Sequence, residues 1–395
     1  MQHAPAPMAP SFTLPASRLP RVGTTIFTVM SALAQQHGAI NLSQGFPDFD
    51  APAELVALLG EAARAGHNQY APMAGMPVLR EAIAQKVQAL YGAVADPGEE
   101  ITITAGATQA LFTAIAALVH PGDEVIAFTP VYDSYGPSVE LQGGRMVYAD
   151  LAPPAYKPDW AQVAALITPR TRMIILNSPH NPSGSVWSAD DMAALSALVQ
   201  GTNILLLSDE VYEHMVFDGL RHESVLRYPA LAERAVVVSS FGKTYHITGW
   251  KVAYAVAPRA LMAEFRKVHQ FLVFTVHAPS QVALAEFMKR PGWYEQLRAL
   301  YQGKRDIFRQ ALAGSRFELL PCQGTYFQCV RFDALRQGPE EGDRAFVERL
   351  TREHGVAAIP LSAFYPDARD HGVIRFCFAK SATTLEQALD RLRRL

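Results

Sequence analysis

The stretch of sequence that decides the fold is SSFGKTYHITGWK, residues 239–251. It follows AVVV, residues 235–238, a run of mostly β-branched apolar residues that predicts a short buried strand. Lys243 comes just past that strand, where it is poorly placed for packing but well placed to meet a ligand at the edge of an open sheet. Ser240 and Lys251 add a hydroxyl and a second cation nearby.

These three polar side chains suit one ligand that carries both an aldehyde and a phosphate. Pyridoxal phosphate (PLP) is such a ligand, since Lys243 would form its Schiff base while Ser240 and Lys251 hold its phosphate. A basic surface turn with two ordinary lysines is the alternative explanation of the same residues.

The run closely resembles the lysine signature of class I and II aminotransferases, which are PLP enzymes of fold type I. It is most similar to the branch of methionine and kynurenine (glutamine-type) aminotransferases, and the resemblance extends from Asn41 to about Lys380. The resemblance implies a homodimer with shared active sites and transfer of an amino group from an amino acid to a 2-oxo acid.

Length and composition exclude several other classes of protein. A chain of 395 residues with 49% hydrophobic and 18% charged residues can bury a large core, which we expect to be divided into two domains. A net charge of -2 argues against a nucleic-acid binder that relies on bulk charge. The three cysteines form no disulfide framework, so we expect a cytoplasmic protein, and we expect no metal site, signal peptide or membrane span.

Two turn-rich segments near the N-terminus are candidates for the site. Residues 41–49, NLSQGFPDF, read as a loop, and the resemblance implies that the Gly45 backbone N–H meets the substrate carboxylate. A plain linker is the alternative. Tyr70 precedes a second turn, and the resemblance assigns it to the cofactor phosphate of the neighbouring subunit, with ordinary packing as the alternative.

Residues 105–108, AGAT, lie between a predicted strand and a predicted helix. A turn of small residues that opens a helix presents free backbone N–H groups to an anion, so Gly106, Ala107 and Thr108 are candidates for binding the phosphate. Tyr132 follows the next predicted strand, and the resemblance implies that its ring lies over the face of the cofactor pyridine. A packed tyrosine is the alternative.

Two further strand ends carry polar side chains. The rigid loop NSPHNPSG, residues 177–184, resembles a family motif that implies contacts from Asn181 to the cofactor phenolic oxygen and the substrate carboxylate. Asp209 follows the apolar strand predicted over 203–207, and a buried acid there needs a partner such as a protonated pyridine nitrogen. Tyr212 would bond the phenolic oxygen. An aspartate that caps a following helix is the alternative.

A single arginine interrupts the alternating segment GVIRFCFA, residues 372–379, which predicts a strand. An arginine among apolar residues needs an anion, and the resemblance implies that Arg375 binds the substrate α-carboxylate through two parallel bonds. A structural salt bridge is the alternative. Phe27, Tyr132 and Phe274 would form an aromatic pocket, which favours methionine, glutamine or an aromatic amino acid as donor.

Strands alternate with helices from about residue 100 to 260, which predicts an α/β fold with a mostly parallel sheet flanked by helices. The C-terminal part predicts a smaller α+β domain. We expect an extended arm over 1–20, a segment packing with the small domain over 21–50, a large PLP-binding domain over 51–290 and the small domain over 291–395.

The predicted activity is a ping-pong aminotransferase in which Lys243 removes the substrate Cα proton. Two rival functions use the same scaffold. One is a carbon–sulfur β-lyase acting on a cystathionine-like substrate. The other is the non-enzymatic effector domain of a transcriptional regulator, which should carry an N-terminal winged helix.

Overall fold

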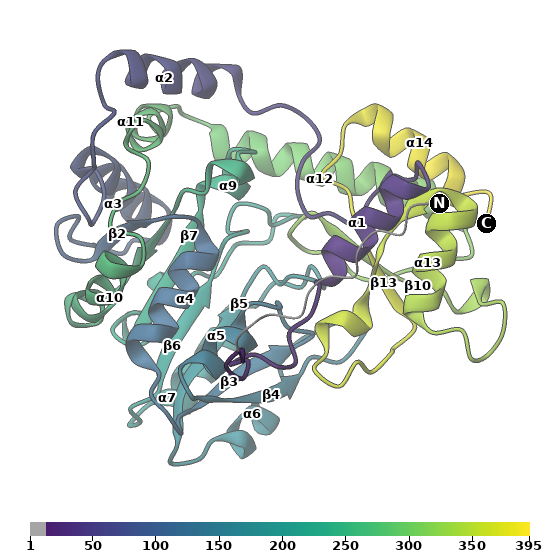
Figure 1. Ribbon diagram of the computed structural model, residues 1–395, viewed down its shortest axis with the longest axis horizontal. Coiled ribbons are helices and arrows are strands. Elements are labelled where there is room, and N and C mark those ends of the chain that lie inside the picture. The colour runs from purple at the N-terminus through teal and green to yellow at the C-terminus, as the bar shows by residue number, and fades with distance from the viewer. Residues whose placement is uncertain (1–12) are drawn as a thin grey trace.

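A seven-stranded sheet forms the centre of the computed structural model, which describes residues 13–395; most of the expected arm lies outside them (Figure 1). The strand order is β2-β8-β7-β6-β5-β3-β4. β8 runs antiparallel to β2 and β7, and the other neighbouring pairs are parallel, which confirms the predicted mostly parallel sheet. The strands are β2 (Ile101–Thr104), β3 (Glu124–Thr129), β4 (Arg145–Asp150), β5 (Thr171–Asn177), β6 (Leu205–Asp209), β7 (Ala235–Ser240) and β8 (Ala253–Val256).

Both faces of this sheet are buried, because helices cover each of them. In β5, Met173 and Ile175 point to one apolar cluster, while Ile174 and Leu176 point to another on the opposite face. This is why the central strands read as continuous apolar runs rather than as an alternation. The first face packs against α4 (Ala107–Leu118), α5 (Tyr135–Leu141) and α10 (Arg259–Leu272), and the second against α6 (Trp160–Leu166), α7 (Ala189–Val199) and α8 (Pro229–Ala232).

A third apolar cluster lies at the β2 edge of the sheet. It joins helices from two distant parts of the sequence, which pack on each other and on β2 and β8. These helices are α2 (Ala53–Arg64), α3 (Pro77–Tyr91) and α11 (Ala278–Phe287). α3 begins at Pro77, and Gly92 directly after its last residue adopts the left-handed conformation typical of a helix C-terminus.

A smaller antiparallel sheet in the order β12-β13-β10-β9 follows the long helix α12 (Trp293–Leu312). The N-terminal segment joins this part of the fold, because β1 (Ile40–Asn41) pairs with β11 (Val356–Ala357) and α1 (Ile26–Gln36) contacts α13 (Asp343–His354) (Figure 1). The exact domain boundaries stay a prediction. The other elements are β9 (Glu318–Leu319), β10 (Phe327–Arg331), β12 (Ile359–Pro360), β13 (Val373–Cys377) and α14 (Ala382–Leu392).

Element boundaries differ from the predicted ones by a few residues, for reasons of pairing. The strand expected from residue 203 begins at Leu205, where its pairing with Met173 of β5 begins. α10 ends at Leu272, and Phe274 beyond it has a positive φ of 69°. No helix among residues 13–395 is long and apolar enough to cross a bilayer.

Candidate active site

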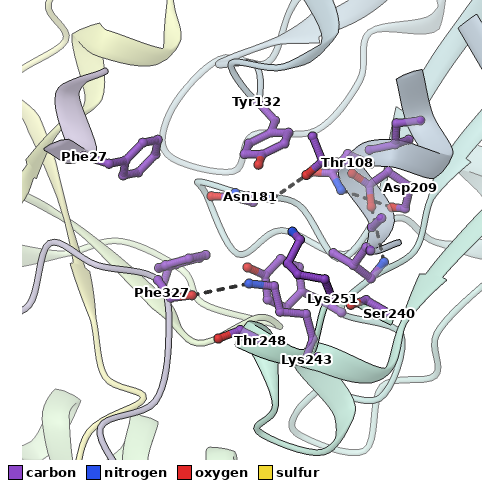
Figure 2. Close-up of a pocket in the computed structure, with 18 of the residues that line it drawn as sticks. Phe27, Thr108, Tyr132, Asn181, Asp209, Ser240, Lys243, Thr248, Lys251 and Phe327 are labelled. Carbon is purple, nitrogen blue, oxygen red and sulfur yellow. Dashed lines mark hydrogen bonds between the residues drawn. The ribbon is translucent and has the colours of Figure 1, made fainter. Parts of the chain in front are cut away.

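A cavity of about 350 Å³ lies at the edge of the large sheet where β3, β5, β6 and β7 end. The carboxyl ends of parallel strands are the usual place for a ligand in an open α/β sheet. Except for Tyr70 and Phe274, the residues singled out from the sequence all line this cavity. In Figure 2, Phe27 and Phe327 lie at one end of it, Asp209 lies at the other, and Lys243 and Lys251 lie between them.

Lys243 lies in the short helix α9 (Phe241–Thr244), directly after β7. Its Nζ donates to the Tyr326 hydroxyl at 3.0 Å and to the Gly45 carbonyl at 3.4 Å. Burial lowers the pKa of the Lys243 amine to about 8, and the nearby Lys251 cation acts in the same direction. A partly buried amine with a lowered pKa is a nucleophile and a base near neutral pH.

Asp209 ends β6 and is buried, with 4% of its surface exposed. Its carboxylate accepts a hydrogen bond from the Tyr135 hydroxyl at 2.6 Å and one from the Val211 backbone N–H at 3.3 Å. Burial raises the pKa of Asp209 to about 6. The helix-cap alternative is wrong, because the residues after Asp209 form turns and no helix. A cationic group in the cavity would stabilise this carboxylate.

Positive charge is concentrated at the N-terminus of α4. Gly106 caps this helix with a φ of 83°, and a Cβ placed there would lie 3.1 Å from the Lys251 Nζ. Among residues 13–395, the Lys251 ammonium has no carboxylate or other hydrogen-bond acceptor within bonding distance. A lysine ammonium beside the free backbone N–H groups and the positive end of a helix dipole favours an anion bound between them. Ala107, Thr108 and Ser240 line the same end of the cavity.

A second anion site surrounds Arg375 at the centre of β13, where 1% of the residue is exposed. Its guanidinium donates to the Asn181 side-chain oxygen at 2.7 Å and to the Ser43 carbonyl at 3.2 Å, and it lies 3.8 Å from the Phe327 ring centre. The Nε has no partner in the described residues, and no carboxylate there pairs with Arg375. The salt-bridge alternative therefore fails, and the cation is available to an anionic ligand.

Aromatic side chains form the remaining walls. Tyr132 lines the cavity beside the N-terminus of α4, and burial raises the pKa of its hydroxyl to about 12. Tyr212 is buried, and burial also raises the pKa of its hydroxyl above the usual value. The hydroxyls of Tyr132 and Tyr212 therefore stay protonated at neutral pH. The Tyr212 ring packs edge-on against the rings of Tyr326 and Phe327.

Two predicted aromatic residues lie outside the cavity of this chain. Tyr70 is 80% exposed and Phe274 is 51% exposed, and their rings pack edge to face at 5.3 Å. Phe274 was expected in the pocket, and that expectation is wrong for a single chain, because α10 ends at Leu272 and Phe274 lies in an exposed turn. The contact from Tyr70 to a neighbouring subunit stays a prediction.

Sequence reasoning missed several residues of the site. Phe327 and Thr248 line the cavity, and Tyr326 contacts the Lys243 amine. Thr248 lies within residues 239–251, the run that resembles the family signature, so its position in the sequence could have identified it. The two aromatic residues precede or begin β10, whose neighbours are far away in the sequence, and no motif marks them.

Comparison with known proteins identifies the family of the chain. The profile of the family "Aminotransferase class I and II" matches residues 37–392. The methionine aminotransferase of Escherichia coli is 55% identical, over 97% of this chain and 98% of that protein. Human kynurenine–oxoglutarate transaminase 1 is 34% identical, over 96% and 98% of the two chains.

Solved structures give the same relationship. The crystal structure of an Escherichia coli protein with a methionine aminotransferase function superposes with a TM-score of 0.94 at 55% identity, over 97% of this chain and 100% of that one. A variant of the aspartate aminotransferase of Thermus thermophilus superposes with a TM-score of 0.88 at 30% identity, with the same coverage.

Proposed function

The chain belongs to the aminotransferase class I and II family, and on this premise we propose that it works with pyridoxal phosphate bound through Lys243. It is an amino acid aminotransferase of the methionine and kynurenine branch. Bound PLP supplies an aldehyde that takes the amino group and a ring that draws electrons from the substrate Cα. The unpaired Lys251 beside the N-terminus of α4 is the observation that carries this proposal.

The two ends of the cavity fit the two ends of the cofactor. Gly106, Ala107 and Thr108, together with Ser240 and Lys251, would hold the phosphate. Asp209 would face the ring nitrogen, and its buried carboxylate would keep that nitrogen protonated. Tyr132 would cover the ring face, while Asn181 and Tyr212 would donate to the phenolic oxygen.

The substrate would bind between Arg375 and Lys243. Arg375 would receive the α-carboxylate, and the Gly45 backbone N–H would add a further donor. Lys243 would take the proton from the substrate Cα and return it to the acceptor carbon, as general base and then general acid. The amino group would pass to a 2-oxo acid in a second half-reaction, which gives ping-pong kinetics.

The proposed donor is methionine, glutamine or an aromatic amino acid. Phe27 and Phe327 give the substrate end of the cavity an apolar wall, and a 55% identical relative bears the name methionine aminotransferase. We also propose a homodimer in which Tyr70 reaches the partner's cofactor phosphate, since this ring is 80% exposed in the single chain. A cytoplasmic location fits the three free, buried cysteines.

Reduction with borohydride tests the cofactor and its attachment together. After treatment of the yellow holoenzyme and proteolysis, we expect mass spectrometry to find the pyridoxyl group on Lys243 and unmodified Lys251 and Lys380 as internal controls. Labelling of another lysine, or no labelling, would reject the proposal.

A panel of amino acids then tests the substrate. Methionine, glutamine and aromatic donors should bleach the yellow colour fastest and should yield their 2-oxo acids. Release of ammonia and pyruvate from cystathionine, without transamination, would instead favour the β-lyase.

A further inference from the structure

The Tyr326 hydroxyl is a hydrogen-bond partner of the Lys243 amine, and no sequence motif points to it. Tyr326 precedes β10 and has 0% exposure. Its hydroxyl donates to the Gly45 carbonyl and accepts from the Lys243 Nζ at 3.0 Å, while the same Nζ donates to the Gly45 carbonyl at 3.4 Å. The amine therefore lies against two oxygens that are also bonded to each other.

Both oxygens are held in place by their surroundings. The buried Lys380 amine donates to the Phe46 carbonyl at 2.9 Å and to the Gln44 carbonyl at 3.5 Å, so it fixes the backbone on either side of Gly45. The Tyr326 ring packs within 4.8–5.6 Å of the rings of Tyr212, Tyr301 and Phe327. A hydroxyl held by ring packing and by a hydrogen bond is suited to position an amine rather than only to fill space.

The directions of these bonds decide what they do to the amine. The Tyr326 phenol stays neutral, because burial raises its pKa well above the usual value, and its one proton is engaged by the Gly45 carbonyl. Both contacts therefore accept N–H protons from Lys243, and neither donates to the nitrogen. The lone pair of the neutral amine is left free to take a proton from a substrate carbon.

We propose that Tyr326, together with the Gly45 carbonyl, holds the free amine of Lys243 after it has been released from the cofactor and directs its lone pair toward the substrate Cα. This inference rests on the proposed function, because it assumes that Lys243 is released during turnover. It adds to that function a residue which sets the position of the base.

The test compares Tyr326→Phe with Tyr301→Phe. Both variants lose one buried phenolic oxygen from the same aromatic cluster, but the Tyr301 hydroxyl pairs with the His246 ring at 3.0 Å, whereas the Lys243 amine bonds to Tyr326 and Gly45. The charged and titratable groups facing the amine are unchanged in both variants; they are Asp209, Lys251, Arg375 and Cys377.

Each holoenzyme is mixed with methionine, and the donor half-reaction is followed by stopped-flow absorbance. We expect Tyr326→Phe to slow this step at least about tenfold, because a hydrogen bond to a charged or reacting group is lost, and Tyr301→Phe to change it less than about twofold. Cofactor affinity should be the same in the two variants. Equal rates in both variants would overturn the inference.

A second readout separates positioning from packing. In the pyridoxamine form of the holoenzyme the Lys243 amine is free, and its arylation by fluorodinitrobenzene can be mapped as a function of pH. The Tyr326 oxygen stabilises the ammonium form, so its loss should move the midpoint to lower pH, whereas Tyr301→Phe should leave it unchanged. An unchanged midpoint in Tyr326→Phe would also overturn the inference.

Two controls keep the result interpretable. If Tyr326→Phe does not fold, difluorotyrosine at position 326 preserves the ring and weakens the oxygen as an acceptor, and the same downward shift of the midpoint is expected; no shift would reject the role. Wild-type enzyme that carries no cofactor on Lys243 would instead reject the proposed function itself.

Discussion

Replacing Arg375 by lysine tests the substrate site most directly. The guanidinium is buried and offers two parallel donors, whereas a lysine ammonium is a point charge without that fork. The change therefore removes one of two charged bonds to the substrate carboxylate. It also removes the stacking on the Phe327 ring, now 3.8 Å from the guanidinium carbon, and leaves the Asn181 side-chain oxygen without its donor.

The loss can be estimated from these contacts. A hydrogen bond to a charged group contributes about 1.5–3 kcal/mol, and burial of Arg375 means that solvent screening does not reduce this value. At about 1.4 kcal/mol for each factor of ten, kcat/KM for the amino acid should fall roughly 10- to 150-fold. Removing the charge altogether, as in Arg375→Met, should cost more than Arg375→Lys.

The assay measures the donor half-reaction with methionine and with the corresponding amine that lacks the carboxylate. Arg375→Lys should slow the reaction of methionine and leave that of the amine nearly unchanged, because the amine has no carboxylate to lose. Arg369→Lys is the matched control, since Arg369 binds Asp150 through two bonds of 2.7 and 2.9 Å outside the cavity. Equal losses for methionine and for the amine would refute the assignment of Arg375.

Three other predictions follow from the charges. Lys251→Gln should weaken binding of PLP about tenfold or more in a fluorescence titration but leave binding of unphosphorylated pyridoxal unchanged; equal losses would argue against a phosphate site. Lys86→Met should lower the free energy of unfolding in urea by about 3–5 kcal/mol, because the buried Glu213 carboxylate, 2.6 Å away, loses its partner. Adding Glu213→Gln should recover much of this loss. A Lys86→Met variant as stable as the wild type would contradict this prediction. Since the pKa of Lys243 is lowered to about 8, the rate of the donor half-reaction should rise with pH through about 8 and level off above it. A rate that falls over this range would exclude the Lys243 amine as the base.

The Lys86–Glu213 pair also sets a direction for stability against pH. Its partners hold the pKa of Glu213 well below the usual value, although burial alone would raise it. A carboxyl whose pKa is lower in the folded state contributes stability above its unfolded pKa of about 4.3 and loses it as the pH falls further. The free energy of unfolding should therefore fall less steeply with decreasing pH in a variant that lacks both charges of this pair than in the wild type.

Local sequence determined the polar residues that line one edge of the large sheet. Lys243, Asp209 and Asn181 each lie at or just after the end of a short apolar strand, and parallel strands end at a common edge, so a parallel sheet places all three at that edge. The turn that opens α4 was equally readable, because small residues between a strand and a helix leave backbone N–H groups free.

Contacts between distant segments decided the rest. Arg375 lies 194 residues from Asn181, whose side-chain oxygen it binds, and Tyr326 lies 83 residues from the Lys243 amine that it contacts. Such pairs depend on how the smaller sheet packs against the larger one, and no local pattern encodes that packing. The order of residues along the chain determines which polar side chains stand at each strand end. The tertiary structure decides which of these side chains face one another, because their directions across the cavity depend on how the two sheets are placed relative to each other.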